Sequence, residues 1–415
     1  MKKVFKIVSL ILVVIIAGTL ALSIRPEYSS VNYNPADSQN ETDKTIRFGE
    51  DGKLKILHIP DTHLKHNHNL DPTLWMVEKA CDTEKPDIVM LTGDIVLNCE
   101  SAEDTKKLIN ALMNIFDSRK IPVAVTFGNH DSEQGAMSRE ELMAYYNTFS
   151  CSVSVDDGEE LSGCGTYNIP VLSSDGEKVK FNLWVFDSGD YDEEGRYSCV
   201  QSDQVQWYEQ TSDKLRKEND GEKVNSLVFQ HIIVGEIYDA LQKSDSHKSY
   251  SYKHLYNEDE YYMFDPEGVN YGTIRETPCP GYANYGQFDA MVEKGDVLAM
   301  FTGHDHTNAF GVKYKGIDIV NSLSTRYIGL FHSTQCGYRV IEVDEKDTSS
   351  YETRVERMFD NYDFGTVKEE KENGDEFKYK MAREFAVKGM VQKFATVVYG
   401  NLIEAVTGRQ VTYPD

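Results

Sequence analysis

Short apolar runs alternate along the chain with longer amphipathic stretches. The apolar runs are residues 54–59, 87–91, 121–127, 181–186, 226–229 and 297–301. Nearly continuous apolar runs of this length indicate strands that are buried on both faces of a sheet. Apolar residues at helical spacing fill residues 101–120, 138–149 and 201–219. Strands that alternate with helices predict an α/β domain with a mainly parallel sheet.

Polar side chains follow one predicted strand after another. In chain order they are Asp61-Thr62-His63, Gly93-Asp94, Gly128-Asn129-His130-Asp131, His231 and Gly303-His304-Asp305-His306. The carboxyl ends of parallel strands meet at one edge of a sheet, and ligands bind there in open α/β sheets. Carboxylate and imidazole groups suit zinc, manganese and iron. The pattern therefore predicts a metal site at this edge.

Seven cysteines add no second metal site, because their spacing lacks a C-x-x-C zinc pattern. Cys151 and Cys164 flank a loop rich in glycine and aspartate, so they are candidates for a disulfide. Free buried thiols are the alternative in a chain of this length.

The two ends of the chain differ from its middle. Basic residues precede an uncharged stretch over residues 7–24, so residues 1–25 are predicted to be a signal peptide or a membrane anchor helix. Either one places the protein outside the cytoplasm, anchored or secreted. Residues 26–50 are polar and indicate a linker, and residues 51–350 are predicted to form the main domain, which carries the metal site. Residues 351–415 are predicted to be a helical extension that packs on this domain or meets a membrane surface or a partner.

Composition narrows the class of function. The 43 Lys and Arg residues against 68 Asp and Glu residues give a net charge of −25. Proteins that coat nucleic acids track phosphates with basic surface, so this charge argues against an extended nucleic-acid partner. Hydrophobic residues make up 40% of the chain, which excludes a wholly disordered protein.

Taken together, the motifs resemble those of the calcineurin-like metallophosphoesterases, and within them a branch similar to the purple acid phosphatases. The family pattern is D-x-H, G-D, G-N-H-D/E, a lone H and G-H-x-H, and these blocks stand in that order between residues 61 and 306. The resemblance implies a four-layer αββα sandwich. In the purple enzymes a tyrosine three residues after the G-D aspartate binds ferric iron, and Leu97 stands there in this chain. Manganese, zinc and iron therefore all stay open.

The resemblance also implies roles for individual residues. Asp94 would bridge two divalent or mixed-valence ions, Asp61, His63 and His306 would complete the first site, and Asn129, His231 and His304 the second. A hydroxide bridging the ions would attack phosphorus. His130 would stabilise the developing charge or protonate the leaving group, and Asp131 would orient His130. Gly93, Gly128 and Gly303 would let the backbone turn beneath the ions.

The predicted function is metal-dependent hydrolysis of a small phosphate ester, with phosphomonoesters as the first choice. A phosphodiesterase that acts on nucleotides or lipid head groups is the alternative within the class, and a metal-binding surface protein without turnover is the alternative outside it. Two divalent ions bring about +4 and the carboxylates of Asp61 and Asp94 return about −2. The metal site is thus expected to carry a net positive charge although the protein as a whole is acidic. This arrangement favours a small anionic substrate.

Overall fold

The computed structural model describes residues 42–65, 70–133, 136–155, 161–244, 251–264, 270–327 and 336–357. These residues belong to one compact unit. The predicted signal or anchor segment 1–25 and most of the extension 351–415 lie outside the described residues, so the extracytoplasmic location stays a prediction. Within the described ranges, every helix is too short or too polar to cross a membrane.

The first sheet carries the N-terminal strands. Its order is β15-β14-β1-β2-β3. The strands are β1 (Lys53–Ile59), β2 (Ile88–Thr92), β3 (Val123–Thr126), β14 (Gly337–Asp344) and β15 (Asp347–Arg357). The first three lie parallel to one another, whereas β14 and β15 are antiparallel additions. Because β1, β2 and β3 run the same way, the motifs that follow them lie at one edge.

The second sheet has seven strands in the order β10-β12-β13-β11-β6-β5-β4. They are β4 (Tyr167–Leu172), β5 (Val179–Val185), β6 (Ser226–Phe229), β10 (Asn270–Thr273), β11 (Val297–Thr302), β12 (Ala309–Tyr314) and β13 (Ile317–Asn321). The central strands β5, β6, β11 and β13 are parallel. A small third sheet joins β7 (Gln242–Ser244), β9 (Tyr261–Met263) and β8 (Tyr252–Lys253). The predicted mixed α/β fold with more than one sheet is confirmed.

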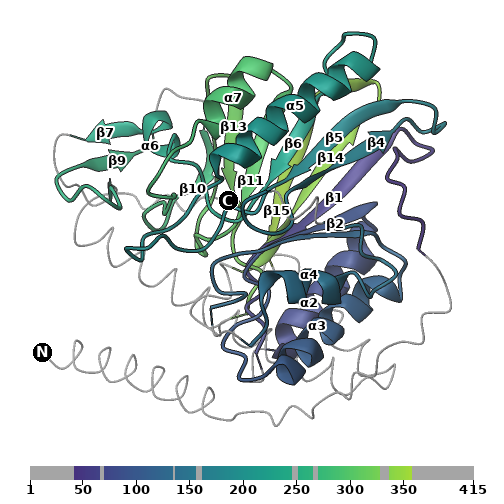
Figure 1. The fold of residues 1–415 in the computed structure, drawn as a ribbon, viewed down its shortest axis with the longest axis horizontal. Coiled ribbons are helices and arrows are strands. Elements are labelled where there is room, and N and C mark those ends of the chain that lie inside the picture. Colours follow the sequence, from purple (N-terminus) through teal and green to yellow (C-terminus); the bar gives the residue numbers. More distant parts are fainter. Residues whose placement is uncertain are drawn as a thin grey trace, which may run out of the picture. The chain divides into compact units, whose positions relative to one another are not determined.

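The helices form two groups. The first is α2 (Leu70–Glu84), α3 (Ala102–Asp117) and α4 (Arg139–Tyr146), which lie together beside β1 and β2 (Figure 1). The second is α5 (Ser202–Glu218) and α7 (Gln287–Lys294), which lie beside β6 and β11, with the short α6 (Ile237–Ala240) near β7. Ser101 caps α3 by accepting the Asp104 N–H at 3.2 Å.

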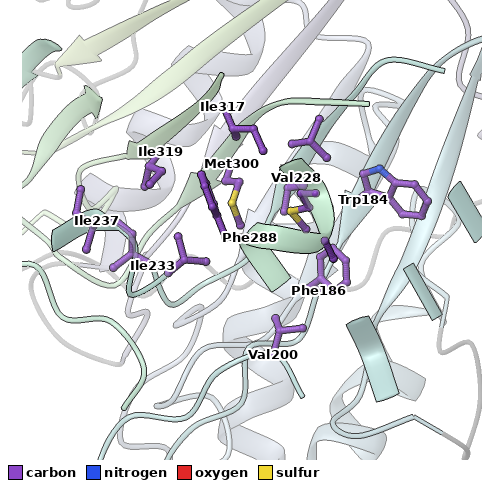
Figure 2. Close-up of a cluster of buried hydrophobic side chains, with 14 of the residues drawn as sticks. Trp184, Phe186, Val200, Val228, Ile233, Ile237, Phe288, Met300, Ile317 and Ile319 are labelled. Atoms are coloured by element: carbon purple, nitrogen blue, oxygen red, sulfur yellow. The ribbon is translucent and has the colours of Figure 1, made fainter. Parts of the chain in front are cut away.

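Alternate side chains of the second sheet enter two different cores. Leu227 and Phe229 of β6 pack in a cluster that also contains Ile56 and Met90 of the first sheet, so the two sheets meet face to face. Val228 points the other way, into a cluster closed by Phe288 of α7 (Figure 2). Burial on both faces explains why these strands are uninterrupted apolar runs.

Two boundaries differ from the prediction. Ile46 and Phe48, within the predicted linker, are 3% and 1% exposed and join the core between the sheets. They alternate with Arg47, which forms a parallel bridge to Leu172, so this short stretch has the period of a strand. At the other end, β15 continues past the predicted boundary at residue 350.

The cysteines are all free thiols in the structure. Cys151 and Cys164 are both buried, and neither forms a disulfide. The alternative of free buried thiols is therefore the one observed, and the core between the sheets needs no covalent link to close it.

Phe288 fills the centre of the cluster in Figure 2 and is fully buried. We expect Phe288→Ala to lower the free energy of unfolding by about 3–5 kcal/mol, because it removes buried surface and leaves a cavity. Urea titration followed by fluorescence measures the change. Tyr285→Ala is the control, since Tyr285 is 49% exposed, and its effect should stay within about 0.5 kcal/mol. Equal losses in the two variants would contradict this description of the core.

Candidate metal centre

Strands from both sheets bring the predicted residues to one place. The loops after β1, β2 and β3 meet those after β6 and β11. The Asp61 N–H donates to the Gly93 carbonyl at 3.1 Å, and the Gly303 N–H donates to the His231 carbonyl at 3.1 Å. Asp61, His63, Asp94 and His304 have φ values of 53°, 43°, 53° and 71°. Left-handed backbone is uncommon for such residues and gathers at functional sites.

The first cluster consists of Asp61, His63, Asp94 and His306, whose ligand atoms all lie within 4.8 Å of one another. His63 Nε2 is 2.9 Å from His306 Nε2 and 3.4 Å from Asp94 Oδ2. His306 Nε2 is 3.6 Å from Asp61 Oδ1. Four ligand atoms that converge from three different loops form a ready set of donors for one ion.

The second cluster consists of Asp94, His231 and His304. His231 Nε2 is 3.4 Å from Asp94 Oδ2 and 3.2 Å from His304 Nδ1. Asn129 belongs with them, because its Oδ1 is 3.2 Å from His231 Nε2. The structure thus brings together all seven residues expected to bind metal, divided as the resemblance implied. Their binding of ions stays a prediction.

Asp94 is common to both clusters. Its Oδ1 accepts the His130 backbone N–H at 2.8 Å. Its Oδ2 is buried and has no hydrogen-bond partner among the described residues, yet imidazole nitrogens face it from both sides. A buried carboxylate oxygen without a partner is costly. Cations held by the two clusters would satisfy it, so the residues present fit a dinuclear metal centre.

The histidines differ in charge state. Burial lowers the pKa of His63 to about 3 and also lowers the pKa of His304 and His306. These three rings are therefore neutral at pH 7, which is the form that binds metal. Burial lowers the pKa of His231 too, but Asp94 outweighs it and raises the value to about 9. A metal ion at the second cluster must displace that proton.

Asp131 does not orient His130, and this prediction is wrong. The Asp131 carboxylate accepts backbone N–H groups of Asp94, Ile95, Val96 and Gly128 at 2.7, 2.8, 3.2 and 2.8 Å. These bonds use its oxygens to hold the loop of the bridging residue. The acid that contacts the His130 ring is Glu133, whose Oε2 is 2.5 Å from Nδ1.

Three glycines allow the loops to approach closely. A Cβ on Gly93 would lie 2.3 Å from the Gly128 nitrogen, one on Gly128 would lie 2.2 Å from Asp94 Oδ1, and one on Gly303 would lie 2.5 Å from Asp61 Oδ2. Of these, Gly93 also has a positive φ, of 86°. These positions therefore require glycine mainly because a side chain would have no space there, and less because the chain must turn.

A cleft of about 790 Å³ adjoins the second cluster. Two of its lining residues contact the candidate ligands. The Tyr191 hydroxyl accepts a hydrogen bond from the Asn129 side-chain amide at 2.8 Å. The Tyr197 ring packs edge-on against the His304 ring, with 4.4 Å between the ring centroids. The bond to Tyr191 turns the Asn129 oxygen towards His231. Both tyrosines lie outside the sequence motifs. They follow β5, and Asp187, a polar residue just after the apolar run of that strand, was the available signal.

Gly128→Ala tests the close approach at Asp94. The new methyl group has no room beside Oδ1, so it must displace the carboxylate shared by the clusters. We expect bound metal to fall from two ions per chain to fewer than about one, as measured by elemental analysis after gel filtration. Gly235→Ala is the matched control, because a Cβ there meets nothing within 4 Å. Full metal content in Gly128→Ala would contradict the assignment.

Comparison with known proteins agrees with this geometry. The model of the family described as calcineurin-like phosphoesterase matches residues 54–308. A protein of Arabidopsis thaliana named probable inactive purple acid phosphatase 29 is 27% identical over 319 residues, which cover 69% of this chain and 74% of that protein. Phosphatase DCR2 of Saccharomyces cerevisiae is 26% identical over 307 residues, which cover 68% of this chain and 48% of that protein.

Among solved structures, a dimetal phosphatase from Danio rerio aligns at 13% identity with a TM-score of 0.46, covering 73% of this chain and 98% of that one. The family match spans all the metal-site motifs, from Asp61 to His306, and more than half of the 415 residues. The chain belongs to the calcineurin-like phosphoesterase family.

Proposed function

We propose that the protein is a dinuclear metal-dependent hydrolase of small phosphate esters, with phosphomonoesters as its main substrates. The observation that carries the proposal is Asp94 Oδ2, which is buried, unpartnered among the described residues and shared by two clusters of ligand atoms. Divalent ions at these positions supply Lewis-acid chemistry, because they neutralise charge on phosphoryl oxygens and activate water.

His130 is placed to act on the reacting phosphate. Its ring lies 5.5 Å from the His63 ring, and its side chain is 29% exposed, so it borders the first cluster and solvent at once. With Nδ1 donating to Glu133, the other ring nitrogen faces away from this bond, and in the imidazolium form it carries the proton that is donated to a phosphoryl or leaving-group oxygen.

The cleft beside the second cluster suits the organic part of a substrate. Tyr191 and Tyr197 stack with 5.6 Å between their ring centroids, and Tyr282 also lines the cleft. Aromatic faces next to a metal centre bind an apolar or aromatic leaving group.

The complete ligand set separates this proposal from a protein that binds metal without turnover. An enzyme that has lost activity is free to lose a ligand, yet Asp61, His63, Asp94, Asn129, His231, His304 and His306 are all present. The word inactive in the Arabidopsis relative's name describes that protein. A phosphodiesterase is the remaining alternative, and substrate comparison decides it.

Removal of metal tests the hydrolase directly. Protein dialysed against a chelator should lose hydrolysis of p-nitrophenyl phosphate and recover it with Mn²⁺ or Zn²⁺, because the carboxylates and imidazoles alone cannot activate water at neutral pH. Asp94→Asn should stay inactive after metal is added. Asp213→Asn should behave like the wild type, because its side chain is 64% exposed and pairs with Lys294 on the surface. Absence of activity with every metal would overturn the proposal.

His130→Ala separates catalysis from metal binding. We expect the turnover number to fall by about 10²-fold or more, with both ions retained, because the backbone N–H to Asp94 survives the substitution. Glu133→Gln should give a smaller loss, since the ring stays in place. Activity assays with parallel elemental analysis measure both effects. Loss of metal from His130→Ala would show that its ring is a ligand.

A further inference from the structure

A partly buried arginine stands beside the first cluster in the loop that follows β13. The Ser324 hydroxyl donates to the Asp61 carbonyl at 2.8 Å, and the Ser324 N–H donates to the His306 carbonyl at 2.9 Å. The next residue, Thr325, donates its N–H to the Pro60 carbonyl at 3.0 Å. The loop is thus fixed to both ligand loops of the first cluster, and Arg326 is the residue it presents next.

The Arg326 guanidinium has no partner within the described residues. No ion pair or side-chain hydrogen bond of Arg326 occurs there, and its Nε is buried without an acceptor. Burial lowers its pKa, with no carboxylate to oppose the shift. Other buried arginines are satisfied: Arg339 donates to Ser322 and Asn321 at 2.8 and 3.1 Å. A buried donor without an acceptor indicates a ligand that completes it.

Lys65 is the cationic neighbour of Arg326. The charge of Arg326 lowers the pKa of Lys65 and of the neutral His63, so Arg326 lies within electrostatic reach of both. His63 in turn adjoins His130, with 5.5 Å between the ring centroids. Arg326 and Lys65 thus place two positive side chains beside the first cluster in a chain of net charge −25, and they provide a site for an anion. The tyrosine-lined cleft lies at the other cluster, by Asn129 and His304.

We propose that Arg326 binds a phosphoryl oxygen of the substrate and so favours phosphomonoesters over phosphodiesters. This inference rests on the proposed function and adds a specificity-determining residue to it. A monoester carries up to two negative charges at neutral pH, because its second pKa is about 6, whereas a diester carries one. Guanidinium binds phosphate oxygens through paired, charge-assisted hydrogen bonds. The organic group then occupies the cleft at the second cluster.

Arg326→Gln in the metal-loaded protein tests the proposal with p-nitrophenyl phosphate and bis(p-nitrophenyl) phosphate. Loss of charge-assisted hydrogen bonds should lower kcat/KM for the monoester about 10–100-fold. The diester value should change less than about 3-fold, and Arg326→Lys should restore part of the monoester rate. An equal loss on both substrates, or no loss, overturns the proposal.

Arg275→Gln is the matched control. Arg275 is exposed, and among the described residues its side chain forms no ion pair; its charged neighbour is Arg357, with Tyr252 nearby. Its rates on both esters should equal those of the wild type. A selective monoester loss in this variant as large as that of Arg326→Gln would show a general charge effect and would overturn the assignment to Arg326.

Binding of inorganic phosphate distinguishes failure of this inference from failure of the proposed function. Calorimetry on the Mn²⁺-loaded protein should show affinity at least about 10-fold weaker in Arg326→Gln than in the wild type. Weaker phosphate binding by the variant supports Arg326 as a phosphate ligand, whether or not the wild type hydrolyses an ester. If the wild type hydrolyses neither ester, only the proposed function is overturned. Unchanged phosphate affinity overturns the role of Arg326 whatever the activity.

Discussion

The carboxylate of Asp94 is the group on which the rest of the site depends. It is fully buried, and its two oxygens have different tasks. Oδ1 is fixed by the His130 backbone N–H, while Oδ2 accepts no hydrogen bond in the described structure and lies 3.4 Å from imidazole nitrogens of both clusters. A buried carboxylate oxygen without a hydrogen bond is costly. Cations at both clusters remove that cost, so metal binding and the ordering of these loops are expected to be coupled.

The fold holds this carboxylate through backbone contacts and close packing. Asp131 binds the N–H groups that flank Asp94, so one buried acid positions the loop of another. Gly128 leaves room for the Asp94 side chain, and Gly303 does the same for Asp61. The two sheets share one core, which brings loops from the first sheet against His231 and His304 of the second. The long apolar strands and the polar loops are thus parts of one arrangement.

The sequence predicted the strands, and it also predicted which polar side chains the structure brings together, because both depend on local patterns. Buried strands are apolar runs, and the candidate metal ligands stand in the loops directly after them. Local patterns did not identify the carboxylate that contacts the His130 ring. Asp131 and Glu133 are both close to it in sequence, and the path of the backbone decides that Glu133 makes the contact. Tyr191 and Arg326 lie outside any motif, and their places depend on long-range contacts. Ile46 and Phe48 were missed because a pair of apolar residues in a polar segment is a weak signal.

The two clusters divide the surroundings of the site into a cationic side and an aromatic side. Arg326 and Lys65 lie by His63, whereas Tyr191 and Tyr197 contact Asn129 and His304. This division suits a small ester with a charged phosphoryl group and an organic leaving group. If Asp94 bridges two ions, an anomalous difference map from crystals loaded with Mn²⁺ shows this most directly. We expect two peaks about 3.5–4 Å apart on either side of Asp94 Oδ2. A single peak, or two peaks that do not share Asp94, would contradict it.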